Sequence, residues 1–154
     1  MPRDQLPPPL TDDDELLYRQ VHPKDCLDGR VASSAFNPSR EHAYELSVAR
    51  EMKTTPEGAY LHHTEKLKRA SNGTWAVSVG QVRAEQLWSY PDPIPPPQDA
   101  FPDPAHAITD FSPVSSSGQR RAKALRLARQ ATDRGRLYPS ATPSEAPRDT
   151  QRDG

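Results

Sequence analysis

Apolar and polar residues alternate in short segments of the chain, and this alternation predicts half-buried strands. Strand-compatible residues fill 16–21, and the His-Pro pair that follows disfavours further pairing. Two more segments, 43–49 and 74–79, alternate cleanly enough to assign a buried face to each. The side chains predicted on those faces are Tyr44, Leu46, Val48, Trp75, Val77 and Val79. The remaining predicted strands are 30–36 and 105–111.

Other segments repeat apolar residues at helical spacing. The triplet 55–57 has the order of an N-cap threonine, a first-turn proline and an early glutamate, so a helix is predicted from there to Asn72. A short helix is predicted over 81–88. The clearest amphipathic pattern covers 119–133, after a serine cap and before Gly135. Its predicted apolar arc contains Ala124, Leu125, Leu127, Ala128 and Ala131.

Proline limits how much of the 154-residue chain can belong to a core. Seven of the 18 prolines lie in 91–104, where neither a helix nor a central strand tolerates them, so this segment is predicted to be an extended connection. Residues 1–13 are polar and proline-rich, and 140–154 contain no large apolar residue, so both are predicted to be disordered. The interpretation is a single α+β domain over 14–139, with a small, mostly antiparallel sheet and two packed helices.

The charge balance argues against a nucleic-acid partner. The formal net charge is -1, which gives no global field that would attract a polyanion. The segment 117–136 is locally basic, with seven basic side chains against one acidic side chain, a local net charge of +6. Few aromatic residues interleave with these cations, so we interpret the segment as the solvated face of a helix that opposes acidic residues near the first strand.

Cysteine usage and hydropathy predict a cytoplasmic location. Cys26 is the single cysteine and cannot form an internal disulfide, which fits a reducing compartment. No stretch reaches the roughly 18 apolar residues needed to span a bilayer, and the first ten residues lack the apolar core of a signal peptide. No membrane association is therefore expected.

Short motifs for metal and cofactor chemistry are missing from the sequence. The five histidines and Cys26 are scattered, and no pair has the i, i+4 or Cys-x-x-Cys spacing of a zinc site. The seven glycines form no phosphate-binding loop, and no G-x-S-x-G nucleophile elbow is present. We therefore expect neither a metal nor a bound cofactor.

One set of polar residues falls on predicted strands or at their ends, where a sheet edge or a cleft would gather them. These candidate site residues are Arg19, His22, Ser33, Ser34, His106 and Asp110. An arginine of this kind would fix a phosphate, and a histidine would act as a general acid or base. The structural alternative is that the arginine pairs with a carboxylate, the serines satisfy a strand edge and the last histidine faces solvent.

Two resemblances bear on this set. An arginine or histidine on the first strand, with the serine pair 33–34 on the next, resembles the ADP-ribosyltransferase family, which implies NAD bound between such residues. That family also needs a late catalytic glutamate, and a candidate such as Glu85 lies in no recognisable motif. The pattern YRQVHP, SSAF and AHAITDF also resembles a family of small bacterial proteins of unassigned activity, which implies a discrete folded domain.

The sequence supports two hypotheses about function. The first is a non-catalytic accessory or interaction protein, whose partner is another protein engaged by the proline-rich arm, the 91–104 connection or the basic helix. The alternative is a small NAD- or nucleotide-handling enzyme. It would use Arg19, His22, Ser34 and His106.

Overall fold

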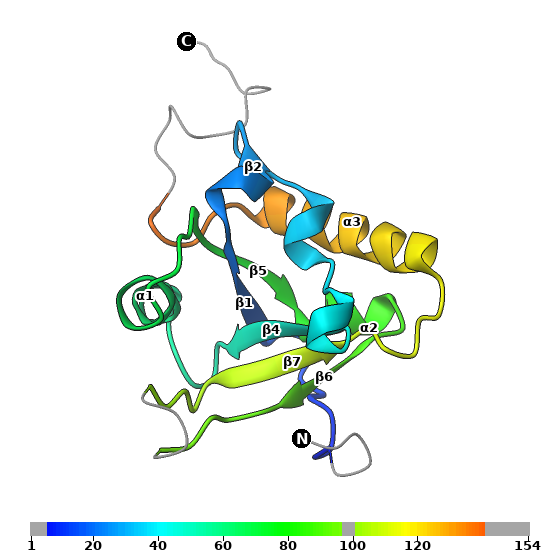
Figure 1. The fold of residues 1–154 in the computed structure, drawn as a ribbon, viewed down its shortest axis with the longest axis horizontal. Helices are drawn as coiled ribbons and strands as arrows, with labels where there is room; N and C mark the ends of the chain where they lie inside the picture. The colour runs from blue at the N-terminus through cyan, green and yellow to red at the C-terminus, as the bar shows by residue number, and fades with distance from the viewer. Residues whose placement is uncertain (1–5, 97–100, 141–154) are drawn as a thin grey trace.

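The computed structural model describes residues 6–96 and 101–140 and has an α+β fold (Figure 1), as the sequence predicts. Five antiparallel strands form the main sheet in the order β5-β1-β4-β7-β6, and β2 and β3 form a separate ribbon. The strands are β1 (Leu16–Val21), β2 (Cys26–Leu27), β3 (Arg30–Val31), β4 (Glu45–Arg50), β5 (Gly73–Ser78), β6 (Trp88–Pro91) and β7 (His106–Asp110). The helices are α1 (Pro56–Leu61), α2 (Val79–Ala84) and α3 (Ser117–Arg134), with 3-10 turns η2 (Pro23–Asp25), η3 (Ser33–Phe36) and η4 (Arg40–His42) and the π-helical turn η5 (His62–Lys66).

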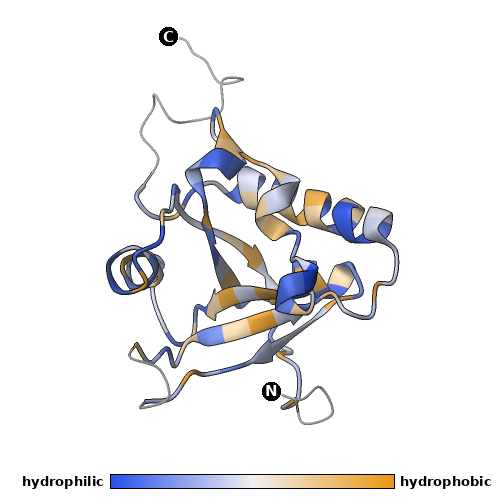
Figure 2. Ribbon diagram, in the orientation of Figure 1, coloured by the Kyte–Doolittle hydropathy of each residue, from blue (hydrophilic) through white to orange (hydrophobic). Residues whose placement is uncertain are grey.

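Helix α3 covers one face of the sheet and supplies much of the core. Ser116 caps its first turn and Gly135 ends it, as the sequence predicts. The side chains of α3 that are buried against the sheet are Ala124, Leu127, Ala128 and Ala131. Figure 2 shows the apolar residues of α3 together with those of β4 and β7. The prediction for Leu125 is wrong, because this residue is 38% exposed. Its side chain lies beside the face of the helix that packs on the sheet, not within it.

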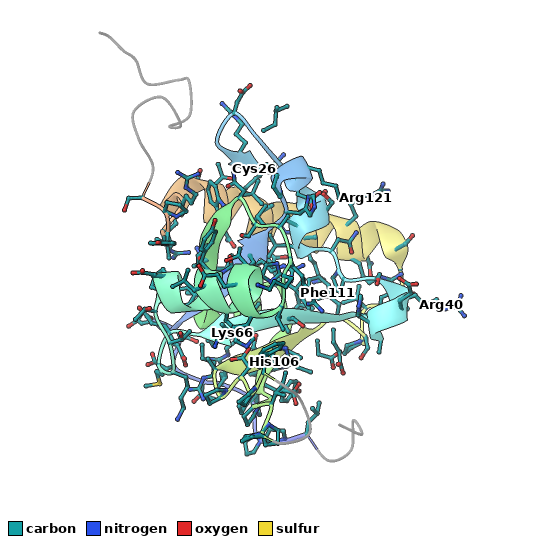
Figure 3. The ribbon with its side chains drawn as sticks, turned by 60° about the vertical axis from the view of Figure 1, so that its left-hand side comes forward. Cys26, Arg40, Lys66, His106, Phe111 and Arg121 are labelled. Carbon is teal, nitrogen blue, oxygen red and sulfur yellow. The ribbon has the colours of Figure 1, made fainter. Side chains whose placement is uncertain are left out.

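The opposite face of the sheet carries α1, so β5 is buried on both sides (Figures 1 and 3). Trp75 and Val77 join the cluster under α3, while Ala76 packs with Tyr18 and Ala59 in a second cluster on the α1 side. The sequence pattern assigns only the first of these two faces. Tyr138 also packs on the α1 side, where the last described residues return to the domain.

The predicted strand over 30–36 is wrong. Only Arg30–Val31 pairs as a strand, with β2, and Ser33–Phe36 forms a 3-10 turn. A strand would direct Ala35 and Phe36 to opposite faces, whereas the turn buries both side chains, which are 2% and 0% exposed. Burial of this phenylalanine beside α3 therefore decides the local conformation.

Other boundaries differ from the prediction as well, and the helix predicted over 81–88 ends at 84, so that 88 begins β6. Strand β4 begins at Glu45, because Tyr44 has a positive φ of 58° that breaks the extended conformation. Val79 is the first residue of α2, since the preceding serine caps that helix in a capping box. The helix that begins at Thr55 stops short of Asn72, as α1 passes into η5 and then ends.

Parts of both proline-rich segments lie against the domain. Within 6–13, Leu10 is 8% exposed, and its amide donates a hydrogen bond of 2.8 Å to the Ser89 carbonyl. Within the 91–104 connection, Ile94 and Asp103 exchange two backbone hydrogen bonds of 2.9 and 2.8 Å. The rest of the predicted arm and connection, and the predicted tail after its first residue, lie outside the described residues.

A buried ion pair fixes the start of β1 to the end of β4. The Arg50 guanidinium donates two hydrogen bonds of 3.1 Å to the two carboxylate oxygens of Glu15, whose side chain is only 1% exposed. The Met52 amide donates to the same carboxylate at 3.2 Å. By contrast, the 2.6 Å pair between Arg83 and Asp13 is exposed. Only the first pair is shielded enough from water for its loss to matter to stability.

Candidate functional site

The main sheet opens between two of its central strands. The ladder between β1 and β4 contains two residue pairs and ends at Tyr18 and Ala49. Continued in the same register, it would place Gln20 opposite Ser47. Instead, the Ser47 carbonyl accepts a hydrogen bond of 3.0 Å from the guanidinium of Arg19. The divergence of the two strands therefore creates a gap with an arginine inside it.

Arg19 is held in this gap by neutral backbone groups. Its Nε donates to the Ala35 carbonyl at 2.8 Å, and its Nη1 donates to the Ser47 carbonyl. Burial lowers the pKa of the guanidinium to about 10, and the negative charge of Asp25 acts in the opposite direction. Among the described residues, no carboxylate forms an ion pair with Arg19. The predicted structural alternative, an arginine paired with a carboxylate, is therefore not what these residues form.

Two hollows meet at Arg19. One lies between the split strands and the η3–η4 segment and has a volume of about 570 Å³. The other lies under α1 and η5 and has a volume of about 520 Å³. The residues that line both hollows are Arg19, Gln20, His42, Ser47, His63 and Arg69. We call the joined hollows the cleft; each has the size of a small-molecule site.

The cleft gathers all five histidines of the chain. The first hollow is lined by His22, His42 and His63, and the second by His42, His62, His63 and His106. Arg69 and Lys53 add positive charge to the lining, and Asp25, Glu45 and Asp103 add carboxylates. Among the described residues, the Nε2 atom of His62 is buried without a hydrogen-bond partner.

His63 shows the electrostatic character of the cleft. The pKa of His63 is lowered from 6.5 to about 4, mainly by burial and next by the positive charge of Arg69. Arg19 and His62 act in the same direction, against a hydrogen bond to the backbone of Ala70 that raises the pKa. The imidazole is therefore neutral at neutral pH, because it is withdrawn from water and lies near positive charge.

His106 joins two other polar side chains in a chain of hydrogen bonds. Its Nδ1 lies 3.0 Å from the carbonyl oxygen and 3.2 Å from the carboxylate Oδ2 of Asp92. Its Nε2 lies 3.2 Å from the hydroxyl oxygen of Ser47. His106 is paired with Ala49 across the β4–β7 ladder, so Ser47, two residues along β4, has its side chain on the same face. Figure 3 shows His106 below the helical segment that α1 begins.

The structure brings only part of the predicted site together. The candidates that line the cleft are Arg19, His22 and His106. Ser34 lies on η3 and donates a hydrogen bond of 2.7 Å to Asp25, which is itself part of the lining. Ser33 also lies on η3, not on a strand, and does not line the cleft. Asp110 lies at the far end of β7, where its carboxylate accepts the amide of Ser112.

The sequence analysis misses two residues that the fold places beside His106. Ser47 follows the alternation of β4 and reads as an ordinary outward polar residue. Asp92 lies within the proline-rich connection and belongs to no motif. No spacing signal could have linked them, because the strand register and the path of the connection bring them together.

The basic helix and Glu85 lie outside the cleft lining. Arg126 donates to the Glu85 carboxylate at 2.8 Å, and Lys123 donates to the carbonyl of the same residue. Arg120 donates to the Val114 carbonyl. The helix therefore binds its own domain through Glu85 and backbone carbonyls.

Comparisons with known proteins assign no function to the cleft. No family model, no curated protein and no solved structure matches this chain. Within residues 6–96 and 101–140, no group of three or more His, Cys, Asp or Glu side chains is placed to hold a metal ion. In the same part of the chain, no helix is long and apolar enough to cross a membrane.

Proposed function

We propose that the cleft binds a small anionic ligand of the phosphate-bearing, nucleotide-like class. The observation that carries this proposal is Arg19, a half-buried guanidinium that is bonded to neutral carbonyls at the junction of the two hollows. A charge that is partly withdrawn from water without an ion-pair partner costs free energy, and a bound anion would offset that cost. A planar guanidinium also matches the oxygens of a phosphate group.

The surrounding side chains fit the same ligand class. Arg69 lines both hollows and would add a second positive charge. An anion between Arg19 and Arg69 would counter the positive field that lowers the pKa of His63, so ligand binding should be coupled to proton uptake by this imidazole. This proposal keeps the nucleotide-handling hypothesis and replaces Ser34 with Arg69 and His63 in the binding set.

A thermal-shift titration tests the proposal. ADP and NAD are compared with adenosine, which lacks phosphate, at millimolar concentration on the full chain. A ligand at 100 times its Kd stabilises the native state by about 2.7 kcal/mol, so Tm should rise with ADP or NAD and not with adenosine. Arg19→Met should abolish the shift. Arg121→Met, which removes an exposed arginine of α3, should retain it.

A pH series tests the proton coupling separately. Sulfate is the probe, because its charge stays constant between about pH 5 and 7, where histidine charge can change. Affinity for sulfate should rise as the pH falls, and His63→Asn should flatten this dependence. A sulfate affinity that is the same at both pH values in the wild-type protein would remove His63 from the binding set.

The interaction-protein hypothesis stays a prediction. The buried Leu10 and the Ile94–Asp103 bridge hold parts of both proline-rich segments against the domain, which leaves less of them for a partner. A pull-down with the arm and the connection replaced by glycine-serine sequence tests it. A partner set that is the same with and without these segments would contradict it.

A further inference from the structure

We propose that Ser47 is a nucleophile activated by His106 and positioned through Asp92, and that it transfers the acyl group of an anionic carboxylic ester. The nucleophile is inferred from the hydrogen-bond chain alone. The anionic character of the substrate rests on the proposed function of the cleft.

The side chains of Ser47, His106 and Asp92 lie within hydrogen-bond reach of one another in sequence. The Ser47 hydroxyl lies 3.2 Å from His106 Nε2, within the reach of a base that tightens its contact when substrate binds. His106 Nδ1 lies 3.2 Å from Asp92 Oδ2 on the other side of the ring. Nucleophile, base and carboxylate therefore occur in the order that activates a serine in acyl transfer.

The contacts of the His106 ring fix the position of its proton. Nδ1 faces two acceptors, the carbonyl oxygen and the carboxylate of Asp92, so this nitrogen carries the hydrogen. Nε2 then has a free lone pair directed at the Ser47 hydroxyl, which donates to it. Asp92 thus holds His106 in the tautomer that can accept a proton from serine.

The surroundings of Ser47 are open to a substrate. The residue is exposed and lines both hollows, so a substrate can reach its hydroxyl. The guanidinium of Arg19 donates to the carbonyl of the same residue at 3.0 Å. This contact places a positive charge beside the backbone of Ser47 in the same cleft, where it would attract an anionic ester.

The reaction balances without an oxidant or a metal. The Ser47 hydroxyl proton moves to His106 Nε2 as the serine oxygen bonds to the ester carbonyl carbon, and the bond from that carbon to the alcohol oxygen breaks. The leaving alkoxide takes the proton from Nε2. Water then repeats the sequence: its proton moves to Nε2, its oxygen bonds to the carbonyl carbon, and the bond to Ser47 breaks as that oxygen recovers the proton. The products are a carboxylic acid and an alcohol.

A fluorophosphonate probe tests the nucleophile on the full chain. The serine oxygen should bond to phosphorus with release of fluoride, and peptide mass spectrometry should place the adduct on Ser47. Ser47→Ala should abolish labelling, and His106→Asn should slow it at least 100-fold. Ser115→Ala, which removes an exposed serine at the start of α3, should label like the wild type.

Two results would overturn the assignment. One is the absence of any adduct on Ser47. The other is an adduct on Ser39 at an equal or faster rate, because the Ser39 hydroxyl lies 3.0 Å from His42 Nδ1 and forms a competing serine–histidine pair.

Ester hydrolysis then separates this inference from the proposed function. The probes are p-nitrophenyl succinate, which carries a carboxylate, and neutral p-nitrophenyl butyrate. Arg19→Met should lower kcat/KM for the anionic ester at least 10-fold more than for the neutral one. If both esters are affected equally while Ser47 is still labelled, the nucleophile stands and the anion site fails. Asp92→Asn should lower kcat about 10-fold with KM and Tm unchanged, because a positioning residue acts on the reaction and not on folding.

Discussion

Arg19→Met separates the contribution of this arginine to folding from its contribution to ligand binding. Methionine keeps the apolar stem of the side chain and removes the guanidinium. The substitution breaks two hydrogen bonds, to the carbonyls of Ala35 and Ser47. Both carbonyls border the cleft, so water can replace the lost donor.

Two opposing terms set the expected size of the effect. A hydrogen bond from a charged donor contributes about 1.5–3 kcal/mol, so the two bonds contribute about 3–6 kcal/mol. Burial of the charge opposes this: the lowering of the pKa of Arg19 to about 10 corresponds to roughly 3 kcal/mol. The net loss of stability should therefore be about 0–3 kcal/mol, and the variant should remain folded.

Urea unfolding followed by tryptophan fluorescence measures this loss, with linear extrapolation to water. Arg121→Met is the matched control, and its stability should change by less than about 0.5 kcal/mol. The refuting result is a loss of 4 kcal/mol or more for Arg19→Met. The guanidinium would then be a structural support of the split sheet, and its charge would need no ligand to explain it.

The remaining predictions concern stability. Burial and neighbouring positive charge lower the pKa of His63 to about 4, so between about pH 6.5 and 4 the unfolded chain binds more protons than the folded one. The free energy of unfolding should therefore fall as the pH is lowered through that range. In a pH series of urea unfolding, His63→Asn should lose less stability than the wild type, and parallel curves would contradict this. Glu15→Gln should lower the free energy of unfolding by about 3–5 kcal/mol, because it leaves a buried arginine unpaired. Asp13→Asn, in the exposed pair, should lower it by less than about 1 kcal/mol. Equal losses in urea unfolding would contradict the role of burial. Leu127→Ala should lower the free energy of unfolding, measured by calorimetry, by about 2–5 kcal/mol, because it leaves a cavity under α3. Leu125→Ala, on the exposed side, should lower it by less than about 0.5 kcal/mol. The reverse order would mean that the helix packs on another face.

Local signals in the sequence were sufficient for most of the secondary structure. The serine cap, the apolar row and Gly135 predict α3 to within two residues at each end, because caps and periodicity act within a few residues of chain. Strand β1 is predicted over its full range for the same reason. The 33–36 turn escapes prediction, since burial of Phe36 beside α3 depends on residues about 90 positions away.

The sequence by itself determined an α+β fold, the strands β1, β4, β5 and β7 and the main helix, together with Arg19, His22 and His106 as polar residues worth testing. Only the tertiary structure decided that β1 and β4 separate, that Arg19 fills the gap and that five scattered histidines line one cleft. It also decided the contacts of Ser47 and Asp92 with His106, which join positions 59 and 14 residues apart. The physical reason is that helix caps and alternation depend on neighbouring residues, whereas strand register is set by pairing across long loops and by burial of the whole core.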